Sequence, residues 1–286
     1  MQFWVIQTLN SLALGGLLFL LAAGFSLIFG LMRIANLTHG AYYMLGAYIG
    51  VSILKVIPNL WIAALLGGLA VALLGGLVER FILRKLSGNE LGQVLVTLGF
   101  AYIIADLCLV VWGGDPIPVP TPEALESPLE IGGFMFPAYR LAVVAIALAT
   151  GVALYLLMER TRLGAMIRAG VDDMQMARAV GIPVSRLFTI VFCLGSALAG
   201  AGGILGGPIM SAYPGLDFDM LPLALIVVIL GGVGSLIGAF VGSFIIGFVY
   251  TFGIALFPQF AYVILFLPMI VVIAFRPRGL FGRQAA

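Results

Sequence analysis

The polar side chains that could take part in chemistry gather near the start of the chain, between two apolar runs. The segment NLTHG holds Asn36, Thr38, His39 and Gly40, and His39 is the only histidine of the sequence. One histidine in a chain without a paired-cysteine motif does not support a metal site. No nucleophile–base pair is evident either, so enzymatic chemistry is not expected. We interpret the segment as a break in a helix.

A second break interrupts the long apolar run 221–257, where the sequence reads GGVGS. Irregular backbone at membrane depth is tolerated only where protein buries it or where it lines a wet cavity. Interrupted helices in two halves of a chain are typical of transport sites. The alternative is a pair of packing or surface turns. On the first interpretation the substrate path contains Asn36, Thr38, His39, Gly40, Gly231, Gly232, Gly234 and Ser235.

Asp106 is the other unusual residue, because it lies inside the apolar stretch FAYIIADLCLVVWGG. A carboxylate within a membrane helix is costly and by default faces a cavity or a partner. It could instead be protonated, or hydrogen-bonded to a neighbouring helix. We add Asp106 to the predicted substrate path.

These residues need a scaffold, and the composition defines its class. The chain has 286 residues, of which 63% are hydrophobic and 9% charged. Soluble domains carry about 25% charged residues. The apolar runs are continuous rather than alternating, which excludes a β-barrel and predicts an all-α polytopic membrane protein. Membrane lipid is its expected surrounding, and nucleic acid is not an expected partner.

Two smaller features fit a membrane protein without special chemistry. Cys108 and Cys193 both lie in apolar runs, which is typical of small buried hydrophobic residues. The N-terminus lacks a basic region and a small-residue cleavage pattern, so we expect no cleaved signal peptide.

About eight transmembrane segments follow from the apolar runs, most of which have the length of one crossing. The runs cover residues 8–31, 41–57, 60–78, 92–112, 141–158, 187–205, 221–257 and 262–275. Run 221–257 is too long for one crossing. It either crosses twice, giving nine crossings, or forms a re-entrant hairpin beside seven crossings. The central glycines favour the hairpin.

The charges orient these segments within one transmembrane domain, residues 1–286. Basic residues concentrate at 80–85, at 160–186 and from 276 onward, whereas loop 113–139 has no Lys or Arg and four acids. By the positive-inside rule the basic segments are cytoplasmic and loop 113–139 is extracytoplasmic. The N-terminus is then outside and the C-terminus in the cytoplasm. Six prolines predict that loop 113–139 is extended.

The cytoplasmic loop 159–186 contains a predicted short helix. Asp172 or Asp173 can cap it, it runs to Val180, and Gly181 ends it. Val171, Met174, Ala177 and Val180 recur every three residues and give it an apolar face. Such a helix either lies on anionic lipid or fits a groove on a partner, and spacing alone leaves both open.

Several stretches together resemble one family. In chain order they are IANLTHGAYYMLGAY, QVLVTLGFAYIIADL, GAMIRAGVDDMQMARAVGIPVSRLFTIVFCLGSALAGAGGIL and VILGGVGSLIGAFVGS, and they are spread over nearly the whole chain. They are similar to the LivH-type branched-chain amino-acid permeases of ABC importers. Asp106 departs from the pattern, since the family would place an uncharged polar residue there.

The resemblance implies an architecture and a set of partners. Such a permease lies in the bacterial cytoplasmic membrane beside a second, homologous permease subunit. Two cytoplasmic ATPases hold the ATP and Mg²⁺, and an extracytoplasmic binding protein delivers the substrate. The chain itself has no G-x-x-x-x-G-K-[ST] segment and binds no cofactor. The implied coupling residues are Gly164, Arg168, Asp172, Asp173, Met174, Ala177, Val180 and Gly181.

The implied function is import of branched-chain or other hydrophobic amino acids by alternating access. Similar permeases carry urea or short amides, which is one alternative. A self-sufficient secondary transporter or channel is another, but it predicts more buried ionisable residues than Asp106 alone. A membrane enzyme or scaffold subunit is a third.

Overall fold

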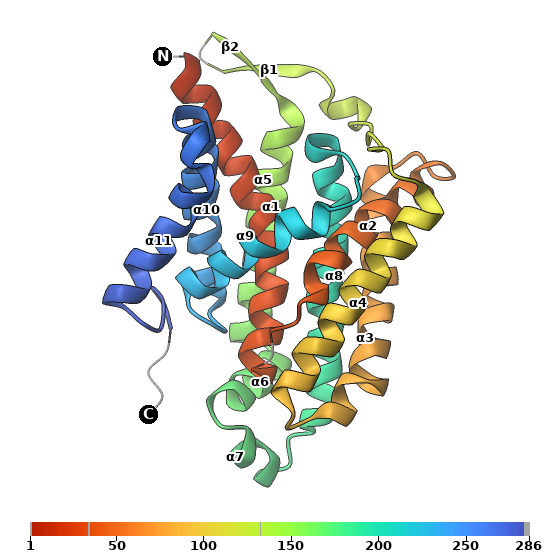
Figure 1. The fold of residues 1–286 in the computed structure, drawn as a ribbon, viewed down its shortest axis with the longest axis vertical. Coiled ribbons are helices and arrows are strands. Elements are labelled where there is room, and N and C mark those ends of the chain that lie inside the picture. The colour runs from red at the N-terminus through yellow and green to blue at the C-terminus, as the bar shows by residue number, and fades with distance from the viewer. Residues whose placement is uncertain (1, 34, 132, 283–286) are drawn as a thin grey trace.

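The computed structural model describes residues 2–33, 35–131 and 133–282, and it is almost entirely helical (Figure 1). Six helices are long and apolar enough to cross a membrane. They are α1 (Gln2–Met32), α3 (Leu60–Phe81), α4 (Glu90–Trp112), α5 (Ala138–Arg160), α8 (Val184–Met210) and α10 (Leu236–Leu256). Three shorter apolar helices lie among them, namely α2 (Thr38–Leu54), α9 (Leu216–Gly231) and α11 (Ala261–Phe275). The helical fold class is therefore as predicted.

Smaller elements mark two opposite ends of the molecule (Figure 1). One end carries the antiparallel strands β1 (Pro128–Ile131) and β2 (Phe134–Pro137) and the 3₁₀ turn η2 (Glu123–Leu125). We call it the hairpin end. The other carries α6 (Arg162–Asp172), α7 (Met174–Ala179) and the 3₁₀ turn η1 (Leu83–Leu86), and we call it the coupling end. Loop 113–139, expected to be merely extended, thus contains a hairpin.

The centre of the bundle is built from α1 and α8, because their glycines let neighbouring backbones touch. A Cβ on Gly46 of α2 would lie 2.2 Å from the Gly200 carbonyl oxygen of α8. A Cβ on Gly24 of α1 would lie 2.5 Å from the Gly195 carbonyl oxygen of α8. Lipid tails give apolar helices no hydrophobic reason to associate, so close packing of this kind must hold them together. Around this centre, α4 and α5 are peripheral, with most of their length uncovered.

The run 221–257 makes two passes and does not form the re-entrant hairpin that its glycines favoured. The turn that joins α9 to α10 lies at the coupling end, where Gly234 packs against Gly30 in the last turn of α1. From there α10 runs to the hairpin end, where Phe252 stacks on Trp4. The 3₁₀ turn η3 (Pro258–Phe260) follows, and then α11. Afterwards Leu280 N donates to Leu230 O at the coupling end. Within the described residues the chain therefore reverses direction as nine crossings would require, although α2 and α9 are helical over only part of the depth.

Substituting Gly46 tests whether backbone contact holds the bundle. We expect Gly46→Ala to lower the free energy of unfolding by about 1–3 kcal/mol, because the added methyl group must push α2 away from α8. Gly99→Ala on α4 is the matched control, since a Cβ there meets nothing within 4 Å. It should be neutral or slightly stabilising, by up to about 1 kcal/mol. Thermal unfolding in detergent measures both; equal effects would contradict the packing argument.

Candidate translocation and coupling sites

The helix break at NLTHG returns the chain to the middle of the bundle. α1 ends at Met32, Arg33 adopts a left-handed conformation with φ 55°, and α2 begins at Thr38. His39 Nε2 lies 3.0 Å from the carbonyl oxygen of Leu21 on α1. Leu21 is eleven residues before Met32, a distance of about 16 Å along a helix. The first turn of α2 therefore lies deep in the bundle, away from the end of α1 (Figure 1).

Side chains of the break satisfy backbone groups there. Thr38 Oγ1 donates to Thr97 O of α4 at 2.7 Å, and Asn36 Oδ1 accepts from Thr38 N at 3.2 Å. His39 is buried and packs edge-on against Phe25. Non-helical backbone inside a membrane needs such partners. Asn36, Thr38, His39 and Gly40 thus lie at the break, and all four are buried within this chain.

A second helix starts at the same depth, and the sequence interpretation missed it. α8 ends at the hairpin end, where Ala212 pairs with Ile117, and α9 begins at Leu216. A Cβ on Gly40 would lie 2.7 Å from the carbonyl oxygen of Asp217, so the first turns of α2 and α9 are in contact. The signal was present in YPGLDFD: Gly215 takes φ 98°, and acids occupy the first turn of α9. Acids favour helix N-termini.

This junction contains polar atoms whose hydrogen bonds are not made within the described chain. Asp217 is buried and its Oδ1 has no hydrogen-bond partner, and the same holds for Asn36 Nδ2 and His39 Nδ1. Buried polar groups in native structures are usually paired, and each exception is costly. The junction is therefore held by fewer bonds than its polar groups could make.

The predicted second break does not lie beside the first. A Cβ on Gly231 would lie 2.2 Å from the Gly238 carbonyl oxygen, and Ser235 caps α10 by accepting from Gly238 N. Gly232 packs against Gly279, and Gly234 against Gly30. Gly30 is nine residues from Leu21, about 13 Å along α1. Gly231, Gly232, Gly234 and Ser235 thus form a tight turn at the coupling end.

Asp106 does not join the buried junction. It lies on the exposed side of α4, six residues before Trp112. Its side chain faces outward from this chain.

The coupling end contains two short helices where one was expected. Asp173 Oδ1 accepts from Gln175 N and Met176 N at 2.9 and 3.0 Å and so caps α7, while Gly181 ends the turn with φ 87°. α6 was not predicted. Thr161 caps it by accepting from Gly164 N, and Gly164 leaves no room for a Cβ beside Met158 O. Asp172 ends α6, and Arg168 pairs with Glu159 at 3.4 Å.

The predicted apolar face of the α7 helix needs correction. Val171 belongs to α6, and Ala177 is buried with 2% of its surface exposed. Met174 is partly buried. Met176 and Val180 are instead 60% and 69% exposed. The helix packs on its own chain through Ala177 and presents Met176 and Val180 outward.

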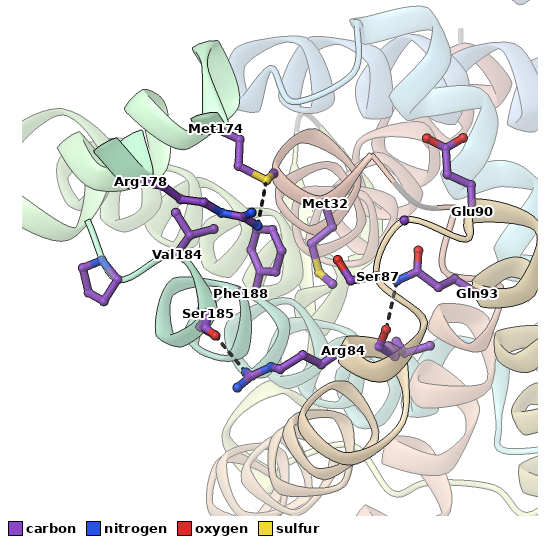
Figure 2. A pocket seen from close by; sticks show the side chains of 13 residues that line it. Met32, Arg84, Ser87, Glu90, Gln93, Met174, Arg178, Val184, Ser185 and Phe188 are labelled. Carbon is purple, nitrogen blue, oxygen red and sulfur yellow. Dashed lines mark hydrogen bonds between the residues drawn. The ribbon is translucent and has the colours of Figure 1, made fainter. Parts of the chain in front are cut away.

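Behind α7 lies a cavity of about 460 Å³. Figure 2 shows Arg178 and Met174 of α7 on one side of it, Phe188 of α8 at its floor, and Arg84 and Gln93 on the other side. The cavity therefore separates α7 from η1 and the start of α4.

A buried ion pair ties α3 and η1 to α8 beside this cavity. Arg84 Nη2 lies 2.9 Å from Glu79 Oε2 and also donates to Ser185 O at 2.8 Å. Thr189 Oγ1 donates to the same Glu79 oxygen at 2.7 Å. Glu79 is completely buried, whereas the Arg84 side chain is 34% exposed. The C-terminal end of α3 and the N-terminal end of α8 therefore move as one body unless this network opens.

The geometry defines a polytopic helical membrane protein with two helices that start inside the bundle and a loop helix presented at one end. Residues 7–273 match the family described as the permease component of branched-chain amino acid transport systems. The chain belongs to this family of ABC-importer permeases. Members of this family are transport subunits and not enzymes, as the sequence predicted for this chain.

Named relatives extend over nearly the whole chain. The branched-chain amino acid permease BraD of Pseudomonas aeruginosa is 27% identical, over 97% of this chain and 95% of its own. LivH of Salmonella typhimurium is 24% identical over 98% and 96%. The autoinducer 2 import permease LsrC of Klebsiella pneumoniae is 28% identical, over 58% of this chain and 49% of its own.

Removing one partner of the buried ion pair should be strongly destabilising. Glu79→Ala removes the carboxylate that pairs with Arg84 and accepts from Thr189, while Ser185 O still accepts from Arg84, and we expect a loss of about 2–3 kcal/mol in unfolding free energy. Glu159→Ala is the control, because Glu159 is exposed in its pair with Arg168. That change should cost less than about 1 kcal/mol. Denaturant unfolding of both variants measures the difference, and similar losses would refute the structural role of Glu79.

Proposed function

We propose that this chain is the membrane-spanning subunit of an ATP-driven importer that moves branched-chain or other hydrophobic amino acids into the cytoplasm. The observation that carries the proposal is the family match over residues 7–273. The relatives named for branched-chain amino acids, BraD and LivH, support the substrate class. LsrC, named for autoinducer 2, makes another small substrate the alternative.

The proposed assembly holds a second, homologous permease, two ATPases and an extracytoplasmic binding protein in the bacterial cytoplasmic membrane. The ATPases bind ATP and Mg²⁺, and this chain binds neither. The charge distribution supports an orientation with the coupling end in the cytoplasm and the hairpin end outside. Arg80, Arg84 and Arg178 lie toward the coupling end. Loop 113–139 at the hairpin end carries acidic residues and no Lys or Arg.

The proposed coupling runs through α7. Its outward residues Met176 and Val180 suit an apolar groove on an ATPase. α7 leads through Pro183 directly into α8, which the Glu79–Arg84 network joins to α3. A movement of α7 driven by ATP thus reaches the bundle centre, where α8 touches α1 and α2. Alternating access then requires that substrate and ATPase contacts differ between the two states.

Reconstitution tests the function. The complex is purified from native membranes through a tag on this chain, its subunits are identified by mass spectrometry, and leucine uptake is measured in proteoliposomes with the binding protein. We expect two ATPases, a second permease and uptake that requires ATP. Uptake of leucine by this chain alone, without ATP, would favour the secondary transporter and overturn the proposal.

A substitution on α7 tests the coupling. We expect Met176→Glu to reduce leucine uptake at least about tenfold, because a carboxylate must be desolvated in an apolar groove. Met135→Glu on β2 is the matched control at the opposite end, where Met135 is similarly exposed. Both variants should elute and unfold like the natural chain. Uptake retained by Met176→Glu, or lost equally in Met135→Glu, would argue against α7 as the docking helix.

A further inference from the structure

The cavity behind α7 has no part in the proposed coupling, although it lies directly against the coupling helix. Its volume of about 460 Å³ is within the range of small-molecule sites. α7 forms one wall, η1 and the start of α4 form the other, and the start of α8 lies at the floor (Figure 2). The two walls and the floor differ in chemistry, and together they specify what the cavity can hold.

The α7 wall offers an unpaired cation, Arg178. Its Nη2 lies 3.7 Å from the sulfur of Met174, which is a weak acceptor, and it forms no ion pair with any residue that the structure describes. Arg84, the other arginine of the lining, is already neutralised by Glu79. A planar guanidinium can hold a carboxylate through two parallel hydrogen bonds. The α7 wall is therefore suited to a carboxylate.

The opposite wall offers oxygen atoms that need a donor. Gln93 is 4% exposed and its Nε2 donates to Leu83 O at 3.0 Å, but its Oε1 accepts from no residue of the described chain. Buried polar atoms of this kind are usually paired. Glu90, three residues earlier, also lines the cavity, and among the described residues it has no ion pair. An ammonium group carries three donors and can satisfy both residues.

The floor between the two walls is apolar. Met32, at the end of α1, and Val184 and Phe188, in the first turns of α8, line it. An aliphatic chain placed there leaves water, which is favourable. A carboxylate, an ammonium group and an aliphatic chain together make an apolar α-amino acid. A phosphate or another dianion fits less well, because Glu90 would repel it.

We propose that this cavity binds an apolar α-amino acid from the cytoplasm, with its carboxylate on Arg178 and its ammonium group on Glu90 and Gln93, and that the bound molecule slows import. The slowing rests on the proposed function, which places this cavity on the side where the imported amino acid accumulates. The bound molecule bridges α7 to the start of α4 and so opposes movement of α7. A ligand that binds one state better shifts the protein toward that state. Import then slows as the internal concentration rises.

Inhibition from the inside tests the proposal. The complete complex is reconstituted in proteoliposomes with ATP in the lumen and leucine-loaded binding protein outside, and the initial rate of ATP hydrolysis is measured. We expect rising luminal leucine to lower this rate at least about fivefold, the lower end of typical coupling between two sites. Luminal N-acetylleucine, which has no ammonium group, should leave the rate unchanged. A rate independent of luminal leucine, or equal inhibition by N-acetylleucine, would overturn the proposal.

A substitution outside α7 tests whether the inhibition arises in this cavity. Each rate is divided by the rate of the same variant without luminal leucine. We expect Glu90→Gln to raise the leucine concentration that halves the rate at least about tenfold, the loss expected for a hydrogen bond to a charged group. Glu123→Gln is the matched control, because Glu123 is an exposed acid in η2 at the hairpin end. Unchanged inhibition in Glu90→Gln, or the same shift in Glu123→Gln, would refute the site.

Arg178 is tested by binding rather than by rate, because it lies on the coupling helix. Equilibrium dialysis measures radiolabelled leucine bound to the complex in nanodiscs, without ATP or binding protein. We expect Arg178→Gln to bind at least about tenfold more weakly. Arg186→Gln should bind like the natural complex, since Arg186 is an exposed arginine of α8 outside the cavity lining. Equal binding by all three complexes, as when an ATPase side chain fills the cavity, would overturn the site.

The two proposals fail in different ways. A complex that binds leucine through Arg178 but shows no ATP-dependent leucine uptake contradicts the proposed function and leaves the binding site standing. A complex that imports leucine at a rate independent of luminal leucine contradicts the inference about this cavity alone.

Discussion

Backbone contact through glycine is the constraint on which this structure depends. α8 can lie against α1 and α2 only because Gly195 and Gly200 meet glycines there, with no Cβ between the two backbones. In lipid, the dispersion contacts of this close packing hold the helices together, because the hydrophobic effect that drives helix association in water is missing. It also fixes the axial position of α2, since Gly46 must face Gly200. A helix fixed at this depth cannot begin where α1 ends, so the chain must first return toward the middle of the bundle.

The start of α2 inside the bundle explains the polar residues of the break. A helix that starts inside a membrane exposes backbone N–H groups that lipid cannot satisfy. Thr38 and His39 bond to carbonyls of α4 and α1, and Asn36 accepts from the first turn of α2. α9 solves the same problem with Asp217, whose acid suits a helix N-terminus but retains an unbonded oxygen. The two starts support each other, and neither has all its bonds, so this junction is more easily rearranged than the glycine-packed centre.

The sequence predicted the elements better than their arrangement. Continuous apolar runs identified the long helices because a bilayer demands about 20 residues of them. Asp173 and Gly181 identified the ends of α7 because capping is local. The turn at Gly231–Ser235 looked like a mid-membrane break, yet it lies at the coupling end, because glycine serves tight turns and close packing alike. The start of α9 was missed because run 221–257 began too late to include Asp217. Ala177 was assigned to a docking face, although periodicity shows that a face is apolar and not what covers it.

The coupling end and the mid-depth junction are linked by short mechanical steps. α6 touches α1 where a Cβ on Gly170 would lie 2.9 Å from Leu31, and Val171 approaches Gly234 in the turn before α10. α7 continues into α8, whose start is fixed to α3 by Glu79 and Arg84. A displacement of the α6–α7 pair therefore acts on the end of α1 and the start of α8 together. Both helices reach the junction as nearly rigid bodies, because their glycine contacts resist sliding. The compliant part is then the junction between the first turns of α2 and α9, where buried polar atoms lack partners.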